Sequence, residues 1–553
     1  MKNYTRYTQY MPIRLADRTW PDKQIEKAPI WCSVDLRDGN QALEVPMNLE
    51  QKVDFFKFLV KMGFKEIEVG FPAASDTEYI FTRTLIEQNL IPDDVTIQVL
   101  TQSREHIIRK TFEALNGVKH AIVHLYNSTS TLQRDVVFCK DKPEITALAV
   151  SGAKLIRELA EEYGSERFVF EYSPESFTGT EPDYAAEICN AVIDVWKPTA
   201  DKKVIINLPS TVEMGTPNIY ADMIEYMCRN IKNRENVLIS LHAHNDRGCA
   251  VAASELGILA GADRVEGTLF GNGERTGNAD IMNIAMNMYT QGIDPCLDFS
   301  HIDNAVEIYE KSTNMSVHPR HPYAGSLVFT AFSGSHQDAI NKGMNKMKEH
   351  PDRWEVPYLP IDPVDVGRNY DPIIRINSQS GKGGVAYILE HSYGLHVPKI
   401  MQQHFSSIVT RVSDSQNKEL LPEEIYHLFE NEYINLSNPI GFESYAEGET
   451  EGDDSTVNAV ITVNGEKKNI SGCGNGILSA FCKALMNEFG ITFEVTNYSE
   501  HSLEYGSKSR AITYMHISGA DGSSFYGAGV SGSISKSSIK AVVSAVNKMM
   551  QTK

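Results

Sequence analysis

No stretch of the chain approaches the roughly 20 consecutive apolar residues that a membrane-spanning helix needs. The N-terminal segment MKNYTRYTQYMP has no apolar run of the kind found in a secretory signal peptide. The eight cysteines are scattered, with no CxxC pair and no dense spacing that would indicate a disulfide framework. These absences together predict a cytoplasmic protein whose cysteines are reduced thiols.

Basic residues are scarce relative to acidic ones. The 52 lysines and arginines stand against 72 aspartates and glutamates, which gives a formal net charge of -20. Nucleic acid and anionic membranes would be repelled over most of such a surface, so we expect neither as a partner. A small anionic substrate would need a local cluster of cations or a metal ion. The 42% hydrophobic content is typical of a folded globular protein, and the length of 553 residues predicts several domains.

A strand-helix rhythm runs from residue 30 to residue 270. After the first run, Asn48 and Gln51 fit a helix capping box and Gly63 occupies a C-cap position. Eight strands alternating with helices over this length are typical of a (β/α)₈ TIM barrel, and the alternative is an open doubly wound sheet. The expected strands are residues 30–36, 66–71, 95–100, 121–126, 167–172, 203–208, 236–241 and 263–270.

Polar residues favour the barrel over the open sheet. They fall at or just after the C-terminal ends of the expected strands, which is where barrel enzymes build their sites. These residues are Asp38, His124, Glu175, Asn207, His242, His244 and Asn278.

The rhythm is lost after the barrel. We expect an N-terminal extension at residues 1–29, the barrel at 30–296, linker subdomains with several helices at 297–430 and a C-terminal α+β domain at 431–553. The acidic segment Glu443–Asp454 indicates an exposed loop between domains.

The C-terminal domain contains an internal repeat. Hairpin signals begin at Asn464 and Asp521, and helical patterns begin near Ile477 and Ile534, so both pairs are 57 residues apart. Two hairpin-plus-helix units at one period predict a small pseudo-symmetric domain.

Two histidines, His242 and His244, are spaced i, i+2 at the end of the seventh run. Alternate side chains of a β-strand point to the same face, so both can reach one divalent ion. A closed barrel places its first and eighth strands side by side, which would bring Asp38 and Asn278 to the same place. One carboxylate, two imidazoles and an amide suit Mg²⁺, Mn²⁺ or Zn²⁺ with positions left for a substrate. The alternative is a structural salt bridge at the top of the barrel.

Three motifs carry a resemblance to a known group of enzymes. LRDGNQ at 36–41, HAHND at 242–246 and GNGERTGN at 271–278 resemble the barrel metal-dependent lyases and Claisen-type synthases. Within that superfamily the chain is similar, over almost its whole length, to the longer bacterial 2-isopropylmalate synthases. Many relatives, including homocitrate synthases, carry glutamate where this chain has Asn40.

The resemblance implies a condensation of acetyl-CoA with 3-methyl-2-oxobutanoate that yields (2S)-2-isopropylmalate and CoA. It also implies a divalent metal, with Mg²⁺ favoured over Mn²⁺ and Zn²⁺, a homodimer, and feedback inhibition by leucine. The alternatives are a sister synthase that makes citramalate or homocitrate, and a leucine-sensing protein without catalysis.

The resemblance also implies residue roles. Arg37 would stabilise the developing alkoxide. The proton-abstracting machinery would be His336, from a second subunit, with Glu175 and Tyr358. Leu100, Ser173 and Asn207 would hold the isopropyl end of the oxo acid, and His124, Tyr126 and Thr211 would complete its site.

For leucine, the candidate site lies where Gly474 and Gly476 lead into a helix. The free N–H groups of a helix N-terminus suit a carboxylate, and Leu478 and Tyr498 would border the leucine side chain. The alternative is a glycine turn without a ligand.

Overall fold

The computed structural model describes residues 3–13, 15–331, 333–349, 352–370, 382–416, 420–449, 454–504, 506 and 509–552. The chain divides into two compact units. The first comprises Met1–Val328 and Ile361–Asn369, and the second comprises Phe329–Pro360 and Tyr370–Lys553. Within the described ranges, every helix is too short or too polar to cross a bilayer.

The first unit is built on a closed barrel of eight parallel strands, which confirms the TIM barrel and excludes the open sheet. Closure occurs where β1 pairs with β8, with Ile30 opposite Arg264 and Ser33 opposite Gly267. The strands are β1 (Ile30–Ser33), β2 (Glu66–Gly70), β3 (Thr96–Gln102), β4 (Ala121–Ser128), β5 (Phe168–Glu175), β6 (Val204–Ser210), β7 (Val237–Ala243) and β8 (Arg264–Gly267).

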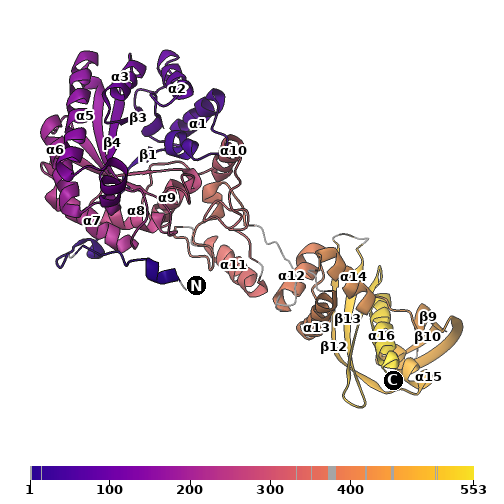
Figure 1. The fold of residues 1–553 in the computed structure, drawn as a ribbon. Coiled ribbons are helices and arrows are strands. Elements are labelled where there is room, and N and C mark those ends of the chain that lie inside the picture. The colour runs from indigo at the N-terminus through magenta and orange to yellow at the C-terminus, as the bar shows by residue number, and fades with distance from the viewer. Residues whose placement is uncertain are drawn as a thin grey trace. The chain divides into compact units, whose positions relative to one another are not determined.

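Helices cover the outside of the barrel (Figure 1). The first of them begins at the predicted capping box, in which Asn48 and Gln51 bond reciprocally, and Gly63 follows its end with φ +103°. The helices of this unit are α1 (Leu49–Lys61), α2 (Asp76–Glu87), α3 (Glu105–Ala114), α4 (Thr131–Gln133), α5 (Lys142–Tyr163), α6 (Pro182–Trp196), α7 (Pro217–Asn230), α8 (Ala250–Leu259), α9 (Ile281–Tyr289) and α10 (Ile302–Thr313).

The N-terminal segment is held against α7. The indole nitrogen of Trp20 donates to Asp222 Oδ1 at 2.8 Å, and the backbone N–H and hydroxyl of Thr19 both donate to Glu225 Oε1, at 3.0 and 2.7 Å. These contacts attach the N-terminal segment, which includes the short 3-10 helix Trp20–Asp22, to the barrel.

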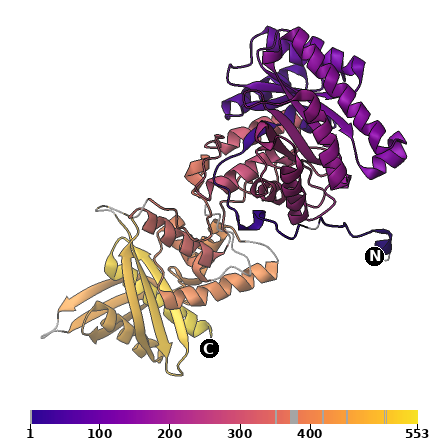
Figure 2. The ribbon, with the colours of Figure 1, turned by 90° about the vertical axis from the view of Figure 1, so that its left-hand side faces the viewer.

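The second unit combines helices with two three-stranded antiparallel sheets, ordered β11-β10-β9 and β12-β13-β14 (Figures 1 and 2). The helices are α11 (Gly334–Met347), α12 (Lys382–Tyr393), α13 (Lys399–Gln416), α14 (Pro422–Tyr433), α15 (Ile477–Phe489) and α16 (Ile534–Gln551). The strands are β9 (Ile440–Glu449), β10 (Ser455–Val463), β11 (Glu466–Gly474), β12 (Phe493–Ser502), β13 (Ala511–Gly519) and β14 (Ser524–Ser531).

The predicted internal repeat is confirmed. Asn464 and Gly465 turn between β10 and β11 with positive φ, and α15 and α16 begin at Ile477 and Ile534. The packing repeats as well. A Cβ on Gly472 would lie 2.3 Å from Ala480 O, and 57 residues further on a Cβ on Gly529 would lie 2.0 Å from Ser537 O. Glycine at both positions lets strand and helix approach closely.

The prediction of a loop over Glu443–Asp454 is wrong for residues up to Glu449. These residues form most of β9 and pair with β10, with Glu447 opposite Val457. Strand β9 lies at the edge of its sheet, where charged side chains are tolerated and hinder pairing with other chains. An acidic composition therefore did not indicate a loop. Residues 450–453 lie outside the described residues.

Candidate active site

The predicted metal ligands meet at the C-terminal end of the barrel. A π-helical turn, Asp35–Gly39, follows β1 and carries Asp38, while β7 carries His242. His244 lies just beyond β7 and pairs with Asn278 in an isolated bridge. The Nε2 atoms of His242 and His244 lie 3.3 and 3.7 Å from Asp38 Oδ2. One ligand atom from each of the three residues falls within 4.8 Å of the others.

The donor set fits a divalent cation. Asp38 Oδ2 and Asn278 Oδ1 are buried and have no hydrogen-bond partner among the described residues. The amide nitrogen of Asn278 donates to Asn272 O at 3.0 Å, which fixes the identity of the free oxygen. Buried oxygen atoms without a donor are costly, and a cation would satisfy both of them.

Burial and charge shift the pKa values of these ligands. Burial alone would raise the pKa of Asp38, but Arg37 and His242 hold it well below its usual value. Burial lowers the pKa of His242, yet the neighbouring carboxylates of Asp38 and Glu266 raise it to about 9. Burial and the neighbouring His242 lower the pKa of His244 to about 4. The cluster thus holds an ionised carboxylate and, in His244, an imidazole that is neutral at pH 7.

Arg37 is fixed on both sides. Its Nη1 donates to Asp38 Oδ1 at 2.7 Å and its Nε donates to Glu68 Oε2. Burial works against its charge, but Glu68 and Asp38 raise the pKa of Arg37 above its already high value. The guanidinium is therefore a permanent, oriented positive charge beside the candidate metal site.

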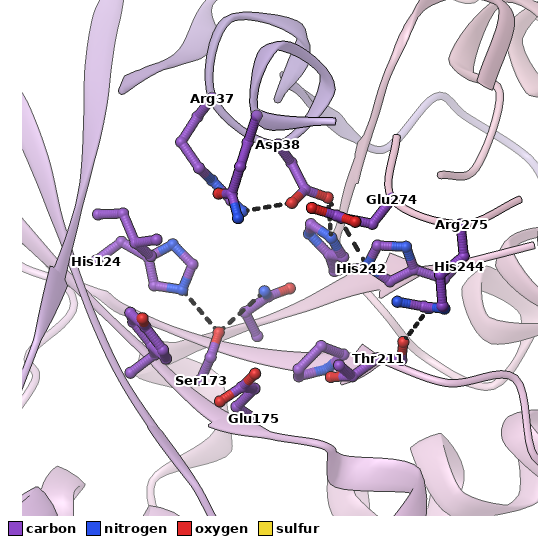
Figure 3. A pocket seen from close by; sticks show the side chains of 15 residues that line it. Arg37, Asp38, His124, Ser173, Glu175, Thr211, His242, His244, Glu274 and Arg275 are labelled. Atoms are coloured by element: carbon purple, nitrogen blue, oxygen red, sulfur yellow. Dashed lines mark hydrogen bonds and ion pairs between the residues drawn. The ribbon is translucent and has the colours of Figure 1, made fainter. Parts of the chain in front are cut away.

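A cavity of about 300 Å³ opens above these residues (Figure 3). Its wall includes every residue expected to contact the oxo acid, together with three of the four metal-ligand candidates. The fourth, Asn278, pairs with His244 in the isolated bridge. The cavity is lined by Arg37, Asp38, Gln41, Leu100, His124, Tyr126, Ser173, Glu175, Asn207, Pro209, Thr211, His242, His244, Glu274 and Arg275.

Hydrogen bonds orient the side chains of the wall. His124 Nδ1 lies 2.9 Å from Glu68 Oε1, and His124 Nε2 lies 2.7 Å from Ser173 Oγ. Asn207 Nδ2 donates to the same Ser173 oxygen at 3.0 Å. Ser173 thus lies between an imidazole and an amide, as Figure 3 shows.

Two further residues of the oxo-acid wall are each oriented by one hydrogen bond. Tyr126 accepts a hydrogen bond from Gln102 Nε2 at 2.6 Å. Thr211 Oγ1 accepts one from the backbone N–H of Ser176 at 2.8 Å.

The three residues expected to act as the base fall in both units. Glu175 ends β5, lines the cavity and accepts a hydrogen bond from Ser128 Oγ. His336 on α11 and Tyr358 belong to the second unit, where their rings stack with centroids 4.0 Å apart. Both are exposed, and Tyr358 is 62% exposed with φ +64°.

The effector candidates lie on both halves of the repeat. Gly474 ends β11, and a Cβ there would lie 2.8 Å from Ala480 N, so close packing on α15 requires glycine. Gly476 is the N-cap residue of α15, and Leu478 packs against the core of the domain. Tyr498 lies on β12, where its hydroxyl is 3.3 Å from Ser538 Oγ.

Sequence reasoning missed the buried acids beneath the cavity. Glu68, Glu171 and Glu266 point into the barrel from β2, β5 and β8 and are at most 1% exposed. A carboxylate inside an otherwise apolar parallel strand is an unusual feature that would have marked them. Glu274 and Arg275 belong to the GNGERTGN motif, and both also line the cavity.

Family comparisons divide the chain into three matched regions. An HMGL-like family profile matches residues 28–308. A profile described as alpha-isopropylmalate synthase, post-catalytic domain-like, matches residues 326–390. The LeuA allosteric (dimerisation) domain matches residues 419–550.

Relatives match along nearly the whole chain. A 2-isopropylmalate synthase of Acetoanaerobium sticklandii is 63% identical over 99% of this chain and 97% of its own length. The enzyme of the same name from Clostridium acetobutylicum is 58% identical over 99% of both chains. That of Helicobacter hepaticus is 56% identical over 99% of this chain and all of its own. With these relatives and this barrel, the chain belongs to the 2-isopropylmalate synthase family.

Proposed function

We infer that the protein condenses acetyl-CoA with 3-methyl-2-oxobutanoate to give (2S)-2-isopropylmalate and free CoA, the first committed step of leucine biosynthesis. The observation that carries this inference is the full-length identity of 56 to 63% with three enzymes named 2-isopropylmalate synthase. The assembled cluster of Arg37, Asp38, His242 and His244 in one cavity supports it, because a chain that had lost catalysis would not need to keep this cluster.

We propose Asp38, His242, His244 and Asn278 as the residues that hold a divalent metal, with Mg²⁺ preferred and Mn²⁺ or Zn²⁺ as alternatives. When bound there, such an ion supplies Lewis acidity that polarises the ketone of a 2-oxo acid. Arg37 contributes a second positive charge, oriented by Glu68 and Asp38, toward the oxygen that becomes an alkoxide.

The composition of the cavity wall supports the proposed choice of oxo acid. Leu100 supplies apolar surface for an isopropyl group, next to Ser173 and Asn207. The amide nitrogen of Asn207 is already shared by two acceptors, Ser173 Oγ and Glu266 Oε2. This amide would therefore not be free to donate to the second carboxylate of a dicarboxylic oxo acid, and leaving that group unpaired is costly.

Proton abstraction from the acetyl methyl group is assigned to His336, with Tyr358 and Glu175. The stacked rings of His336 and Tyr358 support the pairing of these two residues. We propose that they reach the cavity of a second subunit in a homodimer. His336→Ala should lower kcat far more than oxo-acid affinity, whereas His427→Ala, which removes an exposed histidine of α14, should leave kcat unchanged. An unchanged kcat in the His336 variant would exclude the role.

Substrate identity is tested by comparing three oxo acids. Thiol release from acetyl-CoA should show the highest kcat/KM with 3-methyl-2-oxobutanoate. A higher value with pyruvate would indicate a citramalate synthase, and one with 2-oxoglutarate a homocitrate synthase. Either result would overturn the assignment.

We further propose that leucine binds the C-terminal domain near Gly474, Gly476, Leu478 and Tyr498 and inhibits the enzyme. The match of residues 419–550 to the LeuA allosteric (dimerisation) domain supports both this site and the homodimer. Leucine should lower the rate of thiol release. Leucine binding without thiol release under any metal would instead support a sensing protein.

The homodimer is tested by light scattering on the protein as it elutes from gel filtration, which should give twice the chain mass.

A further inference from the structure

A closed ring of side-chain contacts surrounds the floor of the cavity. Beginning at the metal cluster, each member contacts the next at 3.3 Å or less, and the last returns to the first. In order, the members are Asp38, Arg37, Glu68, His124, Ser173, Asn207, Glu266 and His242. The ring therefore connects the metal ligands with the wall that receives the oxo acid.

Glu266 is the member that joins the two halves of the site. One of its oxygens, Oε2, accepts from His242 Nδ1 at 2.7 Å and from Asn207 Nδ2 at 3.1 Å. Its other oxygen, Oε1, accepts from Gln98 Nε2 at 2.9 Å and from Arg264 Nη1 at 2.8 Å. All four acceptor positions of the carboxylate are thus filled.

This carboxylate is rigidly placed. Glu266 is 1% exposed, and Gln98 and Arg264 are fully buried. Glu266 lies opposite His242 in the β7–β8 register, so the two backbones fix the distance between the side chains. Neither Glu266 nor Arg264 lines the cavity, so neither is a candidate for contact with the substrate.

The contact with His242 selects one of its two nitrogen atoms. Because Nδ1 donates to a carboxylate, Nε2 is the nitrogen left for a metal, and Nε2 is the atom that faces Asp38. A carboxylate that holds a metal-binding histidine in this way typically changes metal affinity about 10- to 100-fold.

The contact with Asn207 orients the amide at the oxo-acid wall. Both hydrogens of Nδ2 are used, one toward Glu266 and one toward Ser173. The Asn207 oxygen, Oδ1, is buried without a partner among the described residues. Without the Glu266 acceptor the amide would keep only its hydrogen bond to Ser173 Oγ, so its orientation at the oxo-acid wall would be less constrained.

We propose that Glu266 is a positioning residue that sets both the metal affinity through His242 and the oxo-acid preference through Asn207. This inference rests on the proposed function, since it assumes a metal at the cluster and an oxo acid in the cavity. Through this one carboxylate, the metal site and the oxo-acid wall would be coupled. Chelation of the metal by the oxo acid does not by itself provide this coupling.

The test uses Glu266→Gln in the full-length protein, with Mn²⁺ as the metal probe. Calorimetry should show Mn²⁺ affinity about 10- to 100-fold lower than in the wild type. At saturating Mn²⁺ and without acetyl-CoA, affinity for 3-methyl-2-oxobutanoate should also fall. The circular dichroism spectrum and unfolding temperature report whether the variant is folded. If it folds poorly, Glu266→Asp keeps the charge, shortens the reach to His242 by one methylene and should show the same two losses.

Glu255→Gln is the control. Glu255 lies on α8, accepts a hydrogen bond from Asn287 Nδ2 of α9 at 2.7 Å, and is not among the residues that line the cavity. The substitution therefore removes a carboxylate that is outside the ring. Its Mn²⁺ and oxo-acid affinities should remain within about twofold of wild type.

Asn207→Ala separates the effect of Glu266 on the oxo acid from its effect on the metal. It should weaken oxo-acid binding and leave Mn²⁺ affinity intact, and its effect should not add to that of Glu266→Gln in the double variant. Wild-type Mn²⁺ affinity in Glu266→Gln, or equal losses in Glu255→Gln, would overturn the inference. A wild-type protein that neither binds Mn²⁺ nor releases thiol would instead refute the proposed function.

Discussion

At the scale of single residues, Arg37 depends on having two separate donor nitrogens. One contacts Asp38 and the other Glu68, so the guanidinium plane is fixed. Lysine presents a single point charge and cannot hold both carboxylates in this geometry. We expect Arg37→Lys to lower kcat about 100-fold, in the range seen when one oxyanion donor is removed. Steady-state thiol release measures the effect, with Arg83→Lys on α2 as a control. A kcat within threefold of wild type would contradict it.

His242 connects the candidate metal ligands to the buried acids, so its removal should lower metal affinity directly. We expect His242→Ala to abolish Mn²⁺ binding and thiol release together, because one of three close ligands is removed. Metal content after gel filtration and the rate of thiol release are the measurements. His120→Ala, which replaces an exposed histidine, should change neither. Full activity in metal-free buffer would show that the ligand assignment is incorrect.

The residues of the metal cluster could be predicted from spacing and topology, whereas the buried acids beneath the cavity could not. His242, His244 and Asp38 were found because period-two spacing and barrel closure require them to meet. Glu68 and Glu266 lie within β2 and β8, where polar residues are not expected. Their contacts depend on which side chains of each strand point into the barrel, and the spacing of residues in the sequence does not predict this.

At the scale of elements, the loop 271–278 depends on a glycine. Gly277 has φ +101°, and a Cβ there would lie 1.9 Å from Gly271 O. Its carbonyl accepts from Asn245 N at 2.9 Å, next to His244. We expect Gly277→Ala to lower the free energy of unfolding by about 2 kcal/mol or more, from backbone strain plus the steric clash.

Urea unfolding measures this loss, and Gly292→Ala separates its two causes. Gly292 has φ +79° but nothing within 4 Å of the added Cβ, so only the backbone strain should appear there, about 1 kcal/mol. Equal losses in the two variants would show that the clash with Gly271 is relieved.

The anchor of the N-terminal segment on α7 is sensitive to acid. Burial would raise the pKa of Glu225, but the bonds from Thr19 and Arg229 lower it from 4.5 to about 2. A carboxyl whose folded pKa is depressed stabilises the fold above its unfolded pKa and loses this contribution as the pH falls. The attachment should therefore be complete above about pH 4.5 and lost toward pH 2.

Hydrogen exchange of residues 15–24, corrected for the intrinsic rate, should show protection that falls across this window. Glu225→Gln should reduce the protection at pH 6 and remove its pH dependence. Protection that is independent of pH in the wild type would exclude Glu225 as the anchor.

At the scale of the whole molecule, the second unit has hydrophobic cores of its own. One core of the second unit gathers residues of both sheets with α15 and α16, and another joins α12 to α14 with β13 and β14. A ligand stabilises the unit that binds it by mass action. We expect calorimetric unfolding in two transitions, of which Mn²⁺ with oxo acid raises one and leucine raises the other. A single transition raised by both ligands would contradict this.

The architecture could be predicted from sequence because it repeats. The barrel follows from eight strand-helix units, and the C-terminal domain from two units at one period. The edge strand β9 was predicted to be a loop because its acidic residues obscure the alternation of apolar and polar residues. Its pairing with β10 shows that it is a strand. The domain boundaries at 29, 296 and 430 stay predictions.

The ring of eight side chains around the cavity floor limits how the enzyme can be redesigned. A substitution intended to admit a different oxo acid at Ser173 or Asn207 also changes a hydrogen bond that continues, through Glu266, to His242. Random libraries that vary one position at a time should therefore yield few active variants. Productive changes of substrate preference would require simultaneous replacement of neighbouring ring members, so that each new donor finds an acceptor.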